Sequence, residues 1–409
     1  MWTLRHNYFD PSSFGKSQIE ESIKSLKSRD DLGFLKFVSR TDLIESLNQR
    51  VEEVKAGYDT LAVVGLGGSS LGAKAFLNLN HLVDHRHQVV FFDNSDPQGF
   101  HAKWESLNSH KRTHWLIISK SGSTVEVLSQ FDLISSLLRD QSDLDIKEHC
   151  TVVTQFDQNQ LHRWALENSV PCLEIPEDLG GRYSFFSASG LFPVLFRTDS
   201  LEKIQNGYNW AMKDSDVLSA LVESSMRALE SSCSVSQLWF YRDGTEYFGD
   251  WWTQLWAESL GKRLKLDGTE APSVTSPSFC RGASAQHSVL QQVYEGQKDK
   301  HLIFISASQN ENGSSPAFAK NLSSGFLNAD QTLEDLLQAQ MVGTIESLWD
   351  IDVPSIGLVT PDLDVESSSA LFMLSMLWVA SLGECLGINA FDQPGVEVGK
   401  QKTRQILKA

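Results

Sequence analysis

The chain has few cysteines, and none of them belongs to a paired motif. Five cysteines are spread over 409 residues without a CxxC pair: Cys150, Cys172, Cys233, Cys280 and Cys385. This spacing argues against a disulfide framework and against a structural zinc site. Free cysteines at such spacing are typical of a reducing compartment, so we expect a cytoplasmic protein.

A long hydrophobic run and a surplus of basic residues are also missing. The longest apolar stretch, 370–388, contains Ser375, Ser381 and Glu384, and its uninterrupted part is too short for a membrane span. We expect a buried helix there and no membrane partner. Residues 1–10 are mixed and polar, unlike a signal peptide. The formal net charge of −17 disfavours nucleic acid as a partner, although local donors can still hold a small anion.

The chain does contain a regular alternation of short β-rich runs and helical segments. Residues 12–57 are polar and helical in pattern. Because the runs that follow are short and separated by helix-sized gaps, they predict buried parallel strands of a doubly wound α/β domain. These runs lie at 61–65, 88–92, 115–119, 151–154 and 172–175.

A second series of strands follows a predicted helical segment at 206–231. The chain is too long for one ordinary core, so we predict two α/β domains with mainly parallel sheets, plus helical N- and C-terminal segments. The later strands are expected at 237–241, 302–306 and 356–359. The predicted division is 1–57, 58–200, 201–365 and 366–409.

The first chemically informative segment is the glycine-rich turn 65–72, directly after the first strand of the series. The backbone N–H groups of Gly68 and Ser69, together with a helix N-terminus, suit an oxyanion. The turn is also compatible with a dinucleotide, since Asp93 ends the next strand, although Ser70 replaces the third glycine of that fingerprint. A tight turn without a ligand is the third interpretation.

A second polar turn, 119–124, follows the strand predicted at 115–119. It places hydroxyl groups, one cation and a glycine at a helix start, which suits a phosphate monoester. The alternative is a helix-capping cluster on a polar loop. We expect the phosphate contacts at Ser119, Lys120, Ser121 and Thr124.

This second turn resembles the phosphate loop of the sugar isomerase (SIS) superfamily. Further segments are similar to signatures of the glucose-6-phosphate isomerase family and occur in the family's order: 180–190, 254–262, 286–296 and 389–400. The resemblance implies two SIS-type domains and reversible aldose–ketose isomerisation of glucose 6-phosphate and fructose 6-phosphate. It also implies that no metal and no cofactor take part.

Two stretches depart from the family pattern. Residues 121–124 read Ser-Gly-Ser-Thr, where the family has a threonine-rich loop. Residues 281–285 read Arg-Gly-Ala-Ser-Ala, where Gly-Thr-Asp or Gly-Thr-Asn is expected before the histidine.

Isomerisation needs a base that moves a proton between C1 and C2, and a carboxylate can serve both carbons. The resemblance implies that Glu258, in a tryptophan-rich helical stretch, is this base. The alternative is a surface ion pair with Lys262, one helical turn away. Arg182 follows two glycines, and a cation there would stabilise an enediolate; the alternative is a loop arginine in solvent.

A cyclic sugar must first be opened, and a histidine suits this proton transfer. The resemblance implies that His287 and Lys400 handle the ring, and that Gln254 and Gln393 contact the substrate. It further implies a homodimer in which His287 reaches the site of the neighbouring subunit. Three other histidines are spaced like metal ligands but lie in a polar connector, where we expect them to be solvated: His81, His85 and His87.

Three rival functions stay open at this point. The first is a dual-specificity isomerase that also accepts mannose 6-phosphate. The second is a non-catalytic SIS sugar-phosphate sensor, against which the presence of all four proposed catalytic residues argues. The third is a nicotinamide dehydrogenase.

Overall fold

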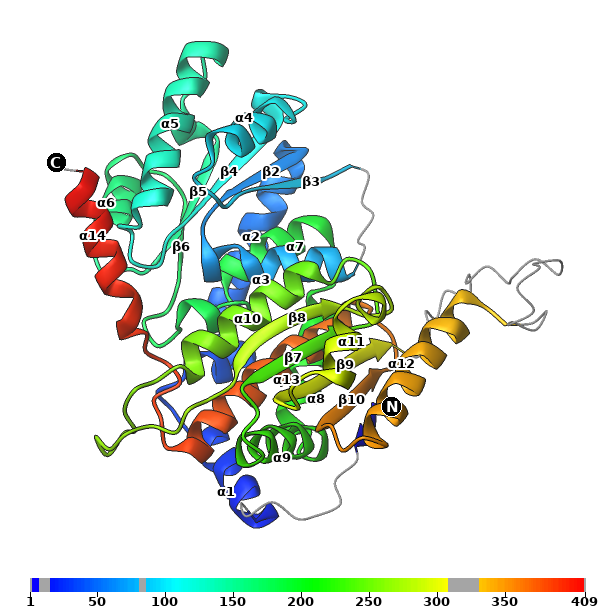
Figure 1. The fold of residues 1–409 in the computed structure, drawn as a ribbon. Helices are drawn as coiled ribbons and strands as arrows, with labels where there is room; N and C mark the ends of the chain where they lie inside the picture. Colours follow the sequence, from blue (N-terminus) through cyan, green and yellow to red (C-terminus); the bar gives the residue numbers. More distant parts are fainter. Residues whose placement is uncertain (1, 7–14, 81–85, 308–330, 408–409) are drawn as a thin grey trace.

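Two five-stranded sheets with helices on their faces form the fold of this chain (Figure 1). The computed structural model describes residues 2–6, 15–80, 86–307 and 331–407. Both sheets are mainly parallel, which confirms the predicted fold class. The four-part division of the chain stays a prediction.

The first sheet has the order β3-β2-β4-β5-β6, and all its strands are parallel. Because β2 lies between β3 and β4, the strand order reverses there, and ligands of such sheets bind at the carboxyl ends of the strands at this point. The predicted strands of this domain are all present: β2 (Thr60–Val64), β3 (Gln88–Phe92), β4 (Thr113–Ile118), β5 (Cys150–Thr154) and β6 (Cys172–Glu174).

The second sheet has the order β1-β10-β9-β7-β8, with only β1 antiparallel. The sequence predicted three of its strands: β7 (Val235–Phe240), β9 (Lys300–Ala307) and β10 (Ser355–Thr360). It missed the two edge strands, β1 (Thr3–His6) and β8 (Ser276–Arg281). The first has four residues, and the second carries Pro277, which a strand tolerates at a sheet edge.

Alternate residues of the strands face two different cores. In the first sheet, Ala62 and Val64 face α4, α5 and α6, whereas Leu61 and Val63 join a core that extends to the second sheet. Leu238 and Phe240 of β7 enter this same shared core, which lies between the two sheets. The helices named here are α4 (Pro97–Glu105), α5 (Val125–Ser142) and α6 (Gln160–Glu167).

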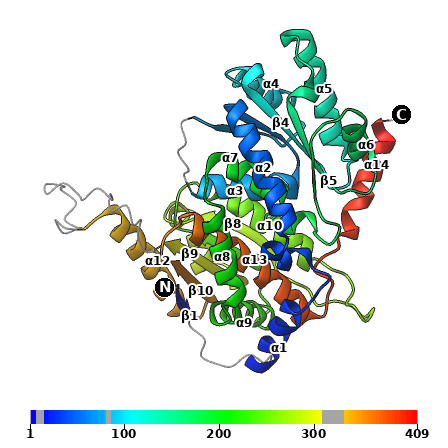
Figure 2. The same ribbon diagram turned by 180° about the vertical axis from the view of Figure 1, so that it is seen from behind.

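The shared core is built by helices from both halves of the chain. From behind, α2 (Thr41–Gly57) is seen in contact with α7 (Ala188–Arg197) (Figure 2). α10 (Glu246–Leu260) packs on α3 (Leu71–Leu79), so the end of α10 is carried toward the carboxyl ends of β2 and β4.

The apolar stretch 370–388 lies within a buried helix, as predicted. This helix, α13 (Val365–Leu386), is the one described helix that is long and apolar enough to cross a membrane. In its most apolar stretch of 18 residues, 89% of the residues are buried inside the protein. It packs against α1 (Lys16–Lys27), α8 (Leu201–Lys213), α9 (Asp216–Glu230) and α10.

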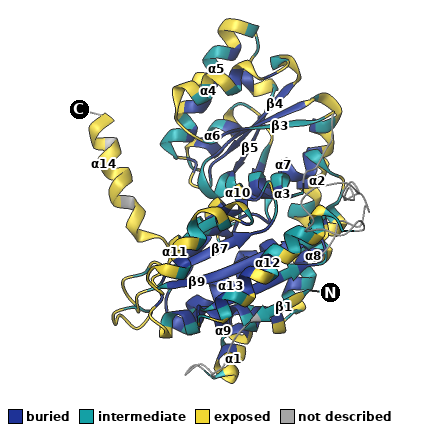
Figure 3. Ribbon diagram, turned by 45° about the vertical axis from the view of Figure 1, so that its right-hand side comes forward, coloured by how far each residue is buried: buried dark blue, intermediate teal, exposed yellow. Residues whose placement is uncertain are grey.

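The expected single helix at 206–231 is in fact two helices, α8 and α9. The Asp214 carboxylate accepts a hydrogen bond from the Val217 N–H, in the first turn of the second helix, at 3.0 Å. The remaining helices are α11 (Val289–Glu295), α12 (Leu333–Trp349) and α14 (Glu397–Leu407). Figure 3 shows that α14 extends from the body of the molecule and that the residues of this helix whose burial is described are exposed.

Candidate active site

The glycine turn after β2 is interlocked with the segment that carries Arg182. A Cβ at Gly68 would lie 2.1 Å from the Gly181 carbonyl oxygen, so only glycine allows this approach. The Ser184 hydroxyl donates to the Gly68 carbonyl at 3.2 Å. Gly67 has a φ of +56° and lies beside the Gln254 side chain. Ser69 closes the short 3₁₀ turn of this loop, next to the start of α3.

The hydroxyl-rich turn after β4 lies next to the glycine turn, because β2 and β4 are neighbours in the sheet. The Ser119 and Thr124 hydroxyl oxygens are 2.9 Å apart, and the Ser121 and Thr124 oxygens are 3.5 Å apart. Thr124 is the N-cap residue of α5, but its side chain makes no capping hydrogen bond. The capping alternative is therefore not supported, and the hydroxyl groups stay at a helix N-terminus that favours an anion.

The Lys120 side chain lies apart from these hydroxyl groups. Its ammonium donates to the Glu177 carbonyl at 2.9 Å and lines a separate polar cavity of about 320 Å³. Burial lowers the pKa of this lysine. Of the four residues expected to hold a phosphate in this turn, Lys120 is the one whose side chain is turned elsewhere.

Arg182 is buried, and all three nitrogens of its guanidinium donate hydrogen bonds. Only 2% of the residue is exposed, so the alternative of a solvated loop arginine is wrong. Its five hydrogen bonds bring three parts of the chain together: the loop before α7, the end of α10 and residues 390–393. The partners are Ser259 Oγ at 2.7 Å, Glu258 Oε2 at 3.3 Å, Gln393 Oε1 at 3.2 Å, the Ala390 carbonyl at 2.6 Å and the Asp392 carbonyl at 2.9 Å.

The Glu258 carboxylate is fixed by two donors and remains partly open to solvent. Gln254 Nε2 donates to one oxygen at 3.0 Å, and Arg182 Nη1 approaches the other at 3.3 Å. The side chain is 23% exposed. Gln254 Oε1 is buried without a partner in the described part of the chain, so an added hydroxyl group could satisfy it.

The ion pair that the spacing of Glu258 and Lys262 suggested is not formed. Lys262 instead donates to the Asp392 carboxylate at 2.8 Å and also to the Asp392 carbonyl. α10 ends at Leu260 with Gly261 as its cap, so Lys262 has left the helical geometry that an i,i+4 pair requires.

His287 and Lys400 lie outside this cluster. His287 ends a short 3₁₀ turn after β8 and is exposed, and within the described residues it makes no hydrogen bond with Arg182, Glu258 or Gln393. Lys400 is on the exposed α14. One chain thus brings Arg182, Glu258, Gln254 and Gln393 together with the glycine turn, but not these two residues.

The acidic residue at the end of β3 is already engaged. Asp93 accepts from Lys74 at 2.7 Å and from Lys103 at 2.8 Å, and its side chain is only 11% exposed. Hydrogen bonds to these lysines lower its pKa, against the effect of burial. A ribose would have to displace both ammonium groups, which argues against the dinucleotide interpretation.

The histidines spaced like metal ligands give no cluster in the described chain. His81 and His85 lie outside the described residues, and His87 is half-buried with its ring edge-on to Phe196 at 5.0 Å, so it is not the solvated residue we expected. Among the described residues, no three His, Cys, Asp or Glu side chains come together as a metal-binding group.

The family comparison decides the class of this protein. The family model described as phosphoglucose isomerase matches residues 41–409, which include the glycine turn, Arg182, Glu258 and Lys400. The chain belongs to the phosphoglucose isomerase family. The resemblance seen in the sequence is thereby confirmed.

Relatives and solved structures agree with this membership. A protein of Methanococcus maripaludis named probable glucose-6-phosphate isomerase is 28% identical over 96% of this chain and 87% of its own length. A hypothetical protein of Thermus thermophilus has a solved structure with a TM-score of 0.87, 26% identity and full coverage of both chains. A glucose-6-phosphate isomerase from Chlamydia trachomatis, at 21% identity, shares the fold with a TM-score of 0.79 over 95% of this chain and 77% of that one.

Ser259 and Tyr183 belong to the site of this phosphoglucose isomerase family member, although the sequence analysis assigned them no role. The Ser259 hydroxyl accepts from Arg182 Nε and lies 3.0 Å from the Tyr183 hydroxyl. Both residues are buried, and burial raises the pKa of Tyr183. The available signal was a small polar residue directly after Glu258, within the segment 254–262 that resembles the family.

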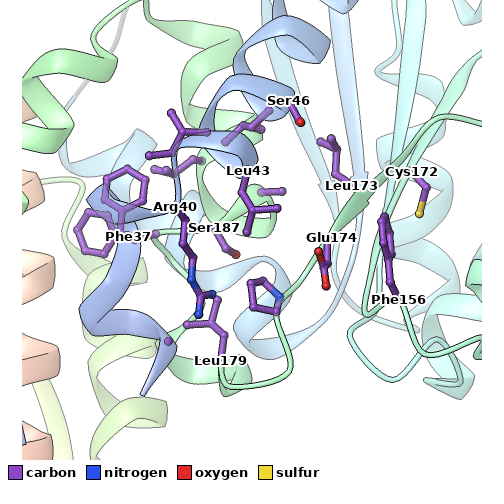
Figure 4. Close-up of a pocket in the computed structure, with 17 residues that line it drawn as sticks. Phe37, Arg40, Leu43, Ser46, Phe156, Cys172, Leu173, Glu174, Leu179 and Ser187 are labelled. Atoms are coloured by element: carbon purple, nitrogen blue, oxygen red, sulfur yellow. The ribbon is translucent and has the colours of Figure 1, made fainter. Parts of the chain in front are cut away.

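The candidate active site around Arg182 and Glu258 is distinct from an apolar cavity of about 120 Å³ between α2 and β6 (Figure 4). Phe37, Leu43, Leu173 and Leu179 line this cavity, and none of the expected site residues does. Arg40 also lines the cavity, but its guanidinium is already bound by the Asp178 carboxylate at 2.6 and 2.7 Å, and a sugar phosphate would lose hydration against the apolar side chains. The cavity is therefore a poor place for a sugar phosphate.

Proposed function

We propose that this chain interconverts glucose 6-phosphate and fructose 6-phosphate through a cis-enediolate. The observation that carries the proposal is the Glu258 carboxylate, held by Gln254 and Arg182 beside the glycine turn that follows β2. Membership of the phosphoglucose isomerase family and the names of the relatives support the same reaction. The relatives do not favour a dual-specificity isomerase or a non-catalytic sensor.

Glu258 is the proposed base. With glucose 6-phosphate in its open form, the carboxylate removes the proton from C2, the electron pair forms the C1–C2 double bond, and the carbonyl oxygen on C1 takes the negative charge. The same group returns the proton to C1 while the hydroxyl proton moves from O2 to O1, which leaves the ketose. A carboxylate held by two donors keeps one position for both transfers.

Arg182 is proposed to stabilise the enediolate as a fixed positive charge. Its N–H groups already have protein partners, so it contributes through its position in a buried site rather than through free donors. A preorganised cation in such a setting needs little rearrangement when charge develops in the transition state.

The substrate phosphate is proposed to lie between the two turns. Gly68 and Ser69 supply one side, and the hydroxyl groups of Ser119, Ser121 and Thr124 supply the other. Lys120 would have to leave the Glu177 carbonyl to reach the same phosphate. Gln254 and Gln393 are proposed to contact the sugar.

We further propose a cytoplasmic homodimer with the site at its interface. Support comes from the exposed positions of His287 and Lys400, which are proposed to open the sugar ring but lie outside the Arg182–Glu258 cluster. His287 of the partner subunit would complete the site. The reaction needs neither a metal nor a cofactor, because a carboxylate and a fixed cation can carry it.

A coupled assay tests the proposal directly. Fructose 6-phosphate is supplied, and glucose 6-phosphate is detected by a dehydrogenase that acts on it. Activity of the wild-type chain, lost in Glu258→Gln prepared in parallel, supports the proposal. No activity above the Glu258→Gln background would contradict it. Mannose 6-phosphate in place of fructose 6-phosphate identifies the dual-specificity alternative.

A further inference from the structure

Residues 389–393 connect the buried helix α13 to the exposed helix α14, and two cations hold this connection. Arg182 Nη2 donates to the carbonyls of Ala390 and Asp392 at 2.6 and 2.9 Å. Lys262 donates to the carboxylate of Asp392 at 2.8 Å and to the carbonyl of the same residue. The connection is thus tied both to the segment before α7 and to the end of α10.

The contact made by Lys262 is the more unusual of the two, because its side chain is buried. Its side chain is 8% exposed, whereas the Asp392 side chain that it binds is 51% exposed. Burial lowers the pKa of Lys262, since its hydrogen bond with Asp392 only partly offsets the loss of hydration. A surface ion pair that served solubility alone would not need a covered ammonium.

The backbone places this lysine next to the proposed base. Lys262 lies two residues after α10, and its own N–H donates to the Leu260 carbonyl at 2.8 Å. Glu258 and Ser259 are in the last turn of the same helix, and both contact Arg182. The backbone of Lys262 is therefore attached to the end of α10, and its ammonium links this helix end to Asp392 in the 389–393 connection.

We propose that Lys262 is a positioning residue that fixes the 389–393 connection against the end of α10, and thereby places Gln393 and the start of α14 relative to Glu258. The inference rests on the proposed function, because it assumes that Gln393 and Lys400 act on the substrate. Lys262 itself touches no substrate in this scheme. It acts through Asp392.

The test compares Lys262→Met with Lys203→Met, Lys262→Arg and the wild type. Methionine keeps most of the aliphatic length and removes the charge. Lys203 is the control for losing an exposed lysine–aspartate pair: its side chain is 57% exposed, and it pairs with Asp364 at 3.6 Å, far along the chain from α10. Hydrogen exchange of peptides covering 388–396 is measured by mass spectrometry, together with Tm and with kcat/KM for fructose 6-phosphate.

In Lys262→Met we expect about tenfold faster exchange in 388–396 and a roughly tenfold lower kcat/KM, with Tm nearly unchanged, since one charged hydrogen-bonded contact is lost locally. Lys262→Arg should recover much of both, and Lys203→Met should match the wild type. Unchanged exchange overturns the inference, as does faster exchange without a loss of kcat/KM. If the wild type has no isomerase activity, the proposed function fails, and the exchange comparison alone then decides whether Lys262 holds the connection.

Discussion

Arg182 and His287 occupy opposite kinds of setting within one proposed active site. Arg182 is 2% exposed and binds groups from two other parts of the chain, whereas His287 is exposed at the end of a short turn. A buried guanidinium without partners would cost several kcal/mol, so the fold itself must assemble the Arg182 cluster. Nothing comparable forces His287 into place. This difference is the basis of the proposal that His287 acts in the site of the partner subunit.

Glu258→Gln tests the buried Arg182–Glu258 cluster, and it should cause the largest loss of activity among the variants. Glutamine keeps the size, and its single amide oxygen can still accept from Arg182, but it cannot take a proton. General-base catalysis is typically worth about 10²–10⁴-fold, so kcat should fall at least that far, with little change in KM and Tm. Steady-state kinetics give kcat and KM, and thermal unfolding gives Tm. More than a tenth of wild-type kcat in the variant would mean that another residue is the base.

Ser119→Ala combined with Thr124→Ala should weaken phosphate binding. Each lost hydrogen bond to a charged phosphate should cost roughly 1.5–3 kcal/mol. If phosphate binding is nearly uniform along the reaction, KM rises far more than kcat falls. Kinetics on fructose 6-phosphate measure the division. An unchanged KM would contradict this assignment, and a fall in kcat alone would place the phosphate contacts mainly in the transition state.

Mixing two inactive variants should sharpen the comparison between the two settings. Glu258→Gln and His287→Ala are each expected to be nearly inactive alone. If His287 of the partner subunit completes the site, random reassociation gives about half mixed dimers, each with one intact site, and about a quarter of wild-type activity. Activity of the mixture is compared with each parent after co-refolding. No gain in a mixture shown to contain mixed dimers would place His287 in the site of its own chain.

The sequence predicted the buried elements of this structure better than the elements at its edges. Buried strands such as those at 61–65 and 302–306 carry their own signal, since short apolar runs between helical segments have few other solutions. The edge strands Thr3–His6 and Ser276–Arg281 have no such signal, because their stability comes from pairing with a neighbour. Likewise, the structure has two helices where one was expected, and the Asp214 carboxylate between them accepts from the Val217 N–H at the start of the second helix.

Within the site, the sequence predicted residue types better than it predicted contacts. The spacing of Glu258 and Lys262 suggested a pair that the end of α10 prevents, and Lys262 binds Asp392 instead. Lys120 was expected beside a phosphate but binds the Glu177 carbonyl. Such choices depend on groups that are distant along the chain, which local patterns do not contain.

His287→Ala and Lys400→Ala should show an effect that depends on whether the substrate is cyclic or open-chain. If both residues serve ring opening, each variant should be less impaired on an open-chain substrate analogue than on the cyclic sugar phosphate. The ratio of kcat/KM on the two substrates measures this. Equal impairment on both would remove the ring-opening role and leave the residues as binding groups.

Chelators should have no effect on activity. A Lewis acid would be needed only if no other group could stabilise the enediolate charge, and Arg182 is a permanent cation placed 3.3 Å from the proposed base. Enzyme dialysed against EDTA should therefore keep its full kcat on fructose 6-phosphate, with untreated enzyme as the control. Activity lost in EDTA and restored by a divalent ion would show that Arg182 alone does not carry this charge. Such a result would also weaken the contrast with His287, since the buried cluster would then be incomplete as well.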